Sequence, residues 1–420
     1  MPAGGGLGAG WRRGAAVKRW YADLHIHIGR TAGGRPVKIT AARDMTFENI
    51  ARECAARKGI EIAGVVDCGS PSVLQEIDAL VASGEMVELP AGGMQYRGTT
   101  TILLACELET VEENGGISHH ISYFPSREQL RAYVGLLQRL VTNLELSSQR
   151  CRLSARQLLQ LTRSVGGTFV PAHAFTPHKS VYGSCAARLG EVLGAEGMAE
   201  VPAIELGLSA DSFLADRIAE LAALTFLSNS DAHSLPRIAR EYNVLWLEEP
   251  SFREVVWALR REQGRKVLAN YGLDPRLGKY HRTFCPACEA IAPQPPPVLS
   301  CPLCGGDKVV RGVLDRICQI ADFPEPRPPE HRPPYHYQVP LQFLPGLGAV
   351  SLGKLLNRFG TEMRVLHEVG QDELEQVVGP RVAHLIVQAR EGALPLLPGG
   401  GGRYGKAVAD QAETQLSLGW

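Results

Sequence analysis

The segment Asp23-Leu24-His25-Ile26-His27 limits what this chain can fold into more than any other short stretch. Its apolar and polar residues alternate, which is typical of a β-strand, and residues two apart in a strand share one face. We therefore expect Asp23, His25 and His27 to point to the same side. Three side chains of metal-ligand type aimed at one place predict a metal site. The alternative is a partly buried strand whose histidines only form hydrogen bonds.

After this segment, predicted strands and helices alternate as far as about residue 270. The continuous apolar run at 60–66 is typical of a strand buried on both faces, and 46–57 has helical spacing. Further strands are predicted at 100–106, 119–124, 168–172, 201–206 and 225–230, and helices at 129–141, 154–164 and 211–224. This order predicts parallel βαβ units, and hence an α/β barrel or a doubly wound sheet.

Donor side chains stand at or just after the ends of several predicted strands. In an α/β barrel the carboxyl ends of the strands form one face, where active sites lie. Mixed histidine and carboxylate ligands suit Zn, Mn or Fe, and bridging carboxylates favour clusters that activate water for phosphodiester displacement. The candidates, besides His25 and His27, are Asp67, Cys68, Glu107, His119, His120, His173, Asp231 and His233.

These motifs resemble those of the PHP (polymerase and histidinol phosphatase) metal-dependent phosphoesterases. The matching segments are 23–27 (DLHIH), 66–68 (VDC), 106–109 (CELE), 120–122 (HIS), 171–173 (PAH) and 230–233 (SDAH). The resemblance covers about residues 20–250 and implies a distorted (β/α)7 barrel, which we expect at 19–272, with up to three metals. The ligands it implies are His25, His27, Glu107, His120, His173, Asp231 and His233. Among them, His25, His27, Glu107 and Asp231 are expected to carry catalysis by holding the metals.

The chain departs from the family pattern in two places. Asp67-Cys68 stands where the family usually has Asp-His, so either residue is a candidate ligand. The family usually also has a histidine shortly after the first motif. That histidine is absent here, and Gly33 stands near its place. His119 also remains an alternative to His120.

Further segments narrow the resemblance to the endonuclease Q family and its bacterial relatives. They are 27–31 (HIGRT), 36–40 (PVKIT) and 231–234 (DAHS) followed by 240–243 (REYN). The resemblance implies a DNA repair endonuclease that cuts 5′ of deaminated bases (uracil, hypoxanthine, xanthine) and abasic sites, with Mg²⁺ or Mn²⁺ for catalysis. Arg30 and Lys38 lie on or beyond the first active-site loop. They either contact a DNA phosphate or are solvated.

Two CxxC pairs follow the predicted barrel, Cys285 with Cys288 and Cys301 with Cys304. Paired knuckles of this kind predict a tetrahedral structural zinc site, in a ribbon that we expect at 281–320. A redox CxxC is the alternative, which the Pro and Gly residues in the turns disfavour. Zinc is also a candidate for the active site.

The next stretches change in composition. Residues 321–340 are Pro-rich and predict a stiff linker, and 341–396 predict a helical region. The segment 344–348 (LPGLG) is similar to the hairpin of helix-hairpin-helix modules, in which a glycine turn presents backbone N–H groups to a DNA phosphate. Gly346, Gly348 and the nearby Lys354 are therefore candidate DNA contacts. An ordinary helical turn is the alternative.

Both ends of the chain are predicted to be flexible, at 1–18 and 397–420. The last six residues (QLSLGW) resemble peptides that dock on replication sliding clamps, although Gly419 interrupts the usual spacing. The anchors would be Gln415, Leu416, Leu418 and Trp420. A tail without a partner is the alternative.

Charge and composition limit how the chain can bind DNA and in which compartment we expect it. Lys plus Arg and Asp plus Glu each number 44, so any DNA groove must be local and its binding should weaken with salt. No apolar run is long enough to span a membrane, and the N-terminus lacks the apolar core of a secretory signal. Six scattered cysteines suit a reducing compartment, so we expect a cytoplasmic, nucleoid-associated protein.

Three functions remain to be weighed. A lesion-specific DNA endonuclease uses every module. A small-molecule phosphoesterase of the histidinol-phosphatase kind needs neither the zinc ribbon, the hairpin nor the tail. A non-catalytic repair adaptor is disfavoured by the nearly complete ligand set, and only Cys68 favours it.

Overall fold

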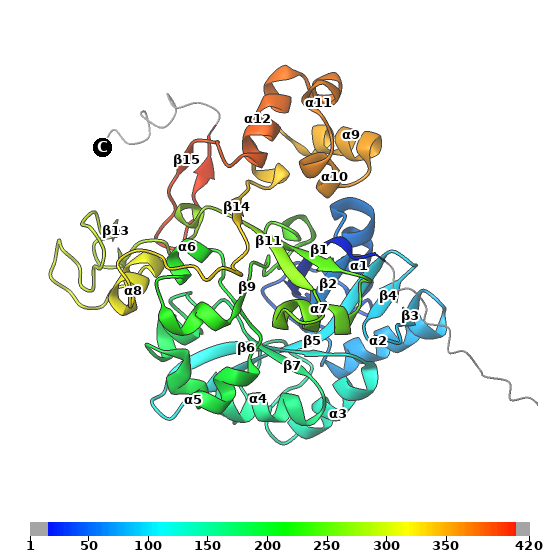
Figure 1. Cartoon of the computed structure of the whole chain (residues 1–420), viewed down its shortest axis with the longest axis horizontal. Coiled ribbons are helices and arrows are strands. Elements are labelled where there is room, and N and C mark those ends of the chain that lie inside the picture. The colour runs from blue at the N-terminus through cyan, green and yellow to red at the C-terminus, as the bar shows by residue number, and fades with distance from the viewer. Residues whose placement is uncertain (1–15, 409–420) are drawn as a thin grey trace, which may run out of the picture.

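The computed structural model describes residues 16–408, and its centre is a curved sheet of mixed direction with helices around it (Figure 1). β1 (Lys18–Ile26) is parallel to β2 (Ile62–Val65), and β2 is parallel to β5 (Thr100–Val111). β6 (Ile117–Phe124) and β7 (Thr168–Pro171) follow, each antiparallel to the strand before it. The antiparallel pairing of β6 with β5 differs from the parallel units predicted, because only a short turn joins these two strands and leaves no room for a crossover helix.

A second parallel pair closes the ring of strands. β8 (Ala203–Glu205) and β9 (Thr225–Leu227) pair with each other. The amide of Ala174, just after β7, donates to the Glu205 carbonyl, and the amide of His27 donates to the Ala232 carbonyl. These bonds join β7 to β8 and the end of β9 to the end of β1. The expected α/β barrel is thus confirmed, in a distorted form.

Additional strands widen the sheet beyond the barrel. β10 (Tyr242–Leu247) is antiparallel to β1, and β11 (Lys266–Gly272) is antiparallel to β10. β3 (Met86–Glu88) and β4 (Met94–Tyr96) extend the other side. The helices around the barrel are α1 (Phe47–Glu53), α2 (Pro71–Ala82), α3 (Arg127–Leu137), α4 (Ala155–Ser164), α5 (Leu189–Glu200) and α7 (Phe252–Arg260).

The barrel interior is apolar at one end and polar at the other. Leu103 and Ala105 of β5 pack inside with Ile121 of β6 and with Val255 and Leu259 of α7. The outer faces of the same strands pack in a separate cluster against the surrounding helices. Since side chains alternate along a strand, this register also turns Glu107 and His119 inward. The apolar packing below the centre therefore sets the direction of its ligands.

The zinc-ribbon region and the Pro-rich stretch both lie against the barrel. The ribbon consists of β12 (Phe284–Cys285), β13 (Ala290–Ile291) and α8 (Val313–Ile320). In the stretch predicted as a linker, β14 (Tyr335–Tyr337) adds to the sheet parallel to β11, and Arg332 pairs with Asp216 at 2.9 Å. The stretch is therefore part of the fold, not a free spacer.

These contacts also explain why the helix predicted at 211–224 is broken. Only α6 (Ser212–Ala215) and a 3-10 turn at Ala219–Ala223 form. Between them the Arg217 carbonyl accepts from the amides of Asp322 and Phe323. Contacts from a distant segment here override the local helical propensity.

The C-terminal region is helical, as predicted. It contains α9 (Ala349–Phe359), α10 (Glu362–His367), α11 (Gln371–Val378) and α12 (Pro380–Arg390). The prediction of disorder from 397 onward is wrong as far as residue 408. There β15 (Leu396–Leu397) pairs with β16 (Lys406–Ala407), and the amide of Gly405 donates to the Leu277 carbonyl. Gln415, Leu416, Leu418 and Trp420 lie outside the described residues.

Within residues 16–408, none of the helices combines the length and the apolar character needed to cross a bilayer.

A buried ion pair joins the helical region to the barrel. The Lys58 ammonium donates to Glu362 of α10 at 2.9 Å and to the Pro236 carbonyl at 2.8 Å. Both side chains are almost fully buried. Pro236 belongs to the loop that follows the Asp231 motif. One ammonium group therefore connects α10, this loop, and the π-helical turn Cys54–Lys58 that follows α1.

We expect Lys58→Met to lower the free energy of unfolding by about 3 kcal/mol or more, because it leaves the Glu362 carboxylate buried without a partner. The double variant Lys58→Met/Glu362→Leu should recover a large part of this loss. Urea unfolding of the two single variants and the double variant measures the coupling. Additive losses would show that the pair contributes no coupling energy.

Candidate functional site

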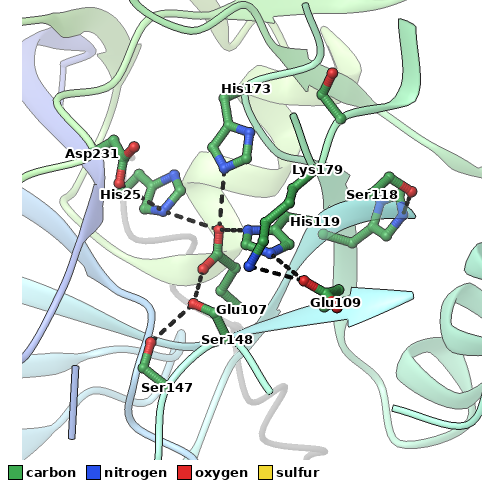
Figure 2. A network of polar contacts seen from close by, with 12 residues as sticks. His25, Glu107, Glu109, Ser118, His119, Ser147, Ser148, His173, Lys179 and Asp231 are labelled. Carbon is green, nitrogen blue, oxygen red and sulfur yellow. Dashed lines mark hydrogen bonds and ion pairs between the residues drawn. The ribbon is translucent and has the colours of Figure 1, made fainter. Parts of the chain in front are cut away.

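Histidines and carboxylates from many parts of the barrel meet at one end, where β1 and β2 have their carboxyl ends and the antiparallel β6 has its amino end. His25 and His27 come from β1 and its end, Glu107 from β5 and His119 from β6. Figure 2 shows Glu107 at the middle of this group, with His25, His119 and His173 directed toward it. Asp231 and His233 follow β9 and complete the centre.

The first set of donors is His25, His27 and Asp231. The Nε2 atoms of the two histidines lie 3.2 Å apart. Asp231 Oδ1 lies 3.4 Å from His27 Nε2 and 3.7 Å from His25 Nε2. His233 Nε2 is 3.2 Å from the same oxygen. Ring nitrogens that converge on one carboxylate oxygen in this way form a candidate metal site.

The second set is Glu107, His119 and His173. Glu107 Oε1 lies 3.0 Å from His119 Nδ1 and 3.4 Å from His173 Nε2. The same carboxylate also faces the first set, since Oε1 is 3.6 Å from His25 Nε2 and Oε2 is 3.6 Å from His27 Nε2. Glu107 therefore stands between two donor sets, where it could bridge two metal ions.

The other ring nitrogen of each of these histidines is held by a neighbouring side chain. Metal-ligating histidines nearly always show this arrangement, because it fixes the tautomer and the ring orientation. It leaves the remaining nitrogen of each ring free to bind a metal. The pairs are His25 with Glu205 (2.9 Å), His27 with Asp67 (3.0 Å), His119 with Glu109 (3.4 Å), His173 with Thr176 (3.3 Å) and His233 with Thr40 (3.4 Å). The residues present thus fit a resident metal cluster.

The electrostatics of the centre also favour cations. Burial alone would lower the pKa of His25, but the charges of Glu205 and Asp231 outweigh it and raise that pKa to about 10. Burial would raise the pKa of Glu107, yet the charges of His119 and Lys38 hold it well below its usual value. The pKa of Asp231 is held low in the same way, chiefly by His25. Carboxylates that stay ionised when buried need positive charge nearby.

Two of these donor residues have strained backbones. Asp231 has φ of 44° and His173 has φ of 28°, although neither is glycine. Such conformations persist only when their surroundings impose them, and they occur often at active sites.

Asp23 holds this strained loop and does not join the ligands. Its carboxylate accepts from the amides of Ser230 (3.0 Å) and Ala239 (2.9 Å). The side chain thus fastens both ends of the segment that carries Asp231 and His233. The sequence pattern alone had grouped Asp23 with His25 and His27.

Glu205 is the functional residue that the sequence reasoning missed. It is fully buried in β8 and its carboxylate accepts from His25. A glutamate inside the otherwise apolar run at 201–206 was the available signal, because a buried carboxylate without a partner would be costly.

The structure distinguishes Asp67 from Cys68. Asp67 Oδ2 accepts from the amide of Ile28 at 2.7 Å besides contacting His27, and its Oδ1 is buried without a protein partner. The Cys68 thiol instead donates to the Val65 carbonyl at 3.1 Å, and burial raises its pKa well above the usual value. Cys68 is also in neither set of donors found among the described residues. Cys68 therefore lies outside the centre.

His120, which the family pattern implied as a ligand, points away from the centre. Its Nε2 lies 2.8 Å from Ser118 Oγ and its ring stacks on Phe169. Burial lowers its pKa to about 3, so the ring is neutral. Neighbouring residues in a strand face opposite sides, and here His119 takes the inner one.

Lys38 lies at the rim of the centre, and Arg30 belongs to the same loop. The Lys38 ammonium is 3.5 Å from Glu107 Oε2, and its side chain is 16% exposed. It can therefore reach both the buried carboxylate and an incoming anion. Arg30 is half-buried at a β-bridge with Pro36.

The four cysteines of the CxxC pairs form a separate cluster. Cys285 Sγ lies 3.9 Å from Cys304 Sγ, and Cys288 Sγ lies 3.8 Å from Cys301 Sγ. These separations are far too long for disulfides. They match the edge of a tetrahedron whose centre is about 2.3 Å from each sulfur, as in a zinc site. The predicted zinc ribbon is confirmed in its geometry.

The glycine turn of the helical region has the expected form. Gly346 has φ of 81°, and Gly348 directly precedes α9. Lys354 is exposed on the same helix. The turn therefore leaves the first amides of α9 free to meet an anion.

We expect Glu205→Gln to weaken metal binding at the centre by roughly 10- to 100-fold, because the charge that orients His25 is lost. Metal content after dialysis and titration calorimetry with Mn²⁺ measure the effect. Glu249→Gln, at an exposed position, is the matched control. Equal affinities in the two variants would contradict the role assigned to Glu205.

We expect Cys288→Ser to remove about one zinc ion per chain without changing the metals of the histidine centre, since the two clusters share no residue. Elemental analysis of the purified variant measures this. Cys318→Ser, whose thiol lies outside the cluster, should keep its zinc. Full zinc content in Cys288→Ser would rule out the four-cysteine site.

Comparison with known proteins identifies the family. No protein-family model matches the chain. The uncharacterized protein YqxK of Bacillus subtilis (strain 168) is 45% identical over 394 residues, which cover 93% of this chain and 99% of that protein. The uncharacterized protein MJ0043 of Methanocaldococcus jannaschii is 38% identical over 226 residues, 48% of this chain and 28% of that protein.

Two solved structures match along nearly their whole length. One is the lesion-specific endonuclease PfuEndoQ from Pyrococcus furiosus, with a TM-score of 0.78, 31% identity, and coverage of 93% of this chain and 95% of that one. The other is endonuclease Q in complex with a 27-mer duplex substrate with an abasic lesion at the active site, with a TM-score of 0.79 and 32% identity. It covers 94% of this chain and 98% of that one. Because both matches are nearly complete at these identities, the chain belongs to the endonuclease Q family of PHP-domain, metal-dependent hydrolases.

Proposed function

We propose that this protein is a DNA repair endonuclease that hydrolyses the phosphodiester on the 5′ side of deaminated bases (uracil, hypoxanthine and xanthine) and of abasic sites. Kinship with a lesion-specific endonuclease supports the class of reaction. A related protein holds a duplex with an abasic lesion at its active site, which supports the class of substrate.

The observation that carries the proposal is the position of Glu107 between two sets of imidazole donors. A carboxylate that faces both sets can hold two metal ions side by side, the arrangement used for phosphodiester displacement. Bound there, Mg²⁺, Mn²⁺ or Zn²⁺ would supply an activated water and neutralise charge on the phosphate. We propose that His25, His27, Glu107, His119, His173, Asp231 and His233 hold these ions.

The side chains around the centre have distinct tasks in this proposal. Glu205 and Asp67 orient His25 and His27 through hydrogen bonds to their Nδ1 atoms. Lys38, at the rim, donates to a non-bridging oxygen of the scissile phosphate and also steadies Glu107. Asp23 keeps Asp231 in its strained conformation through the amides on either side of it.

We also propose that DNA is held beyond the centre by contacts that do not read sequence. Arg30 and Lys354 neutralise backbone phosphates, and the turn at Gly346 and Gly348 offers backbone amides to one more. With a net charge of zero, such local contacts should give binding that weakens steeply as salt rises. The sliding-clamp contact through the last six residues stays a prediction of the sequence.

Labelled duplexes with one uracil, hypoxanthine or abasic site test the proposal, beside undamaged duplex and p-nitrophenyl phosphate, with Mg²⁺ or Mn²⁺ present. We expect a single nick immediately 5′ of the lesion. Asp231→Ala should lower the rate by about a hundredfold or more, since it removes the carboxylate on which three histidine rings converge. Glu249→Gln is the control. Turnover of the monoester with all duplexes intact would instead place the protein among the small-molecule phosphoesterases.

A further inference from the structure

Unpaired buried oxygen atoms gather where the loop after β9 meets β10, β11 and β14. They are Ser228 Oγ, Glu241 Oε2, Asn270 Oδ1 and the Tyr335 hydroxyl, and none of them has a hydrogen-bond partner among the described residues. Ser228 and Asn270 are fully buried, and Glu241 is 1% exposed. Burying a polar atom without a partner costs free energy, most of all when the group is charged. Their gathering at one place therefore points to something bound there.

Asn243 of β10 brings two of these residues together. Its Oδ1 accepts from the backbone amide of Ser228 at 3.0 Å and from Nδ2 of Asn270 at 2.9 Å. Asn270 Nδ2 also donates to the Phe226 carbonyl at 3.0 Å. An amide nitrogen has two hydrogens to donate, so both are used. This fixes the orientation of the Asn270 amide and leaves its Oδ1 as the unpaired atom.

The other two residues meet over Gly272 of β11. A Cβ added at Gly272 would lie 1.9 Å from the Tyr335 hydroxyl and 3.2 Å from Glu241 Oε1, so the missing side chain makes room for both groups. Asn270 is paired with Tyr335 and stands two residues before Gly272, so it shares this face of the sheet. Ser228 lies near enough to the hydroxyl to limit the rise in its pKa that burial and the charge of Glu241 cause.

The charges around Glu241 call for a cation. Its Oε1 accepts from the amide of Leu273 at 2.9 Å, and no side chain of the described residues donates to either oxygen. Burial raises the pKa of Glu241 to about 8, and the charges of Glu205 and Asp23 raise it further. Arg240 opposes this rise, but its guanidinium donates to backbone carbonyls and not to Glu241. A buried carboxylate in such surroundings is costly unless positive charge neutralises it.

We propose that Ser228, Glu241, Asn270 and Tyr335 bind a monovalent cation, Na⁺ or K⁺, through these oxygens. One carboxylate, one amide carbonyl and two hydroxyls are oxygen ligands of the kind that hard cations take. A single carboxylate balances one positive charge, whereas a divalent ion would leave excess charge buried. The site shares no residue with the histidine centre or the cysteine cluster, and the proposal does not rest on the proposed function.

A cation at this place joins parts of the chain that are far apart in the sequence. Tyr335 belongs to β14, which brings the Pro-rich stretch into the sheet, and Glu241 and Asn270 belong to the ends of β10 and β11. Ser228 stands three residues before Asp231. Bound cation should therefore stabilise the junction between the Pro-rich stretch and the barrel, next to the loop of the metal centre.

Thermal unfolding of the full chain in NaCl, KCl or tetramethylammonium chloride, at equal concentration and pH and with the same divalent metal, tests the proposal. We expect Tm to be about 2 to 4 °C higher in NaCl or KCl, because an ion that binds only the folded chain stabilises it. Tetramethylammonium has the same charge but is too large to enter. Glu241→Gln keeps the shape of the side chain and should abolish the difference. Glu249→Gln, at an exposed position, should keep it.

Tyr335→Phe removes one oxygen and should reduce the difference, and it replaces Glu241→Gln if that variant does not fold. Equal Tm values in all three salts would overturn the proposal and indicate that Glu241 instead carries a proton. A difference that persists unchanged in both variants would overturn it as well, since the cation would then act elsewhere. Crystals grown with Rb⁺ or Tl⁺ locate the ion directly. We expect an anomalous peak between Glu241 and Tyr335, and the lack of one there would contradict the site.

Discussion

The arrangement of the metal centre depends on hydrogen bonds between imidazole rings and buried acceptors behind them. Glu205 and Asp67 hold the Nδ1 atoms of His25 and His27, and Glu109 holds Nε2 of His119. Each bond orients a ring so that its other nitrogen faces Glu107 or Asp231. Without these hydrogen bonds, nothing would hold His25 Nε2 and His27 Nε2 at 3.2 Å from each other. The same carboxylates give the site a negative potential that suits divalent cations.

The barrel supplies the second constraint, through the alternation of side chains in its strands. Apolar residues at 103, 105 and 121 pack in the interior, and this register carries Glu107 and His119 inward with them. A shift of the register by one residue would turn His120 and Cys106 toward the centre, and Glu107 and His119 away from it. The choice of ligands is thus decided by core packing as much as by the ligands themselves.

The sequence could predict the alternating strands, the convergence of donors and the four-cysteine site, because each depends on local periodicity or on a short spacing. It could not decide between His119 and His120, or between Asp67 and Cys68, because that choice depends on which face of a strand looks inward. Glu205 was missed because its partner is 180 residues away in the chain. The helix expected at 211–224 and the free tail expected from 397 were overruled by contacts with remote segments, which no local propensity records.

The segments outside the barrel reach the loop that carries Asp231 from two directions. Arg240 connects the carbonyls of Ser230 and Asp231 to Tyr404 of the C-terminal hairpin. Lys58 connects the Pro236 carbonyl to Glu362 of the helical region. Asp231 is a strained residue, and strain persists only where the surroundings impose it. The helical region and the hairpin therefore form part of the support of the centre, and a barrel cut off from them would lose contacts that keep Asp231, a proposed metal ligand, in place.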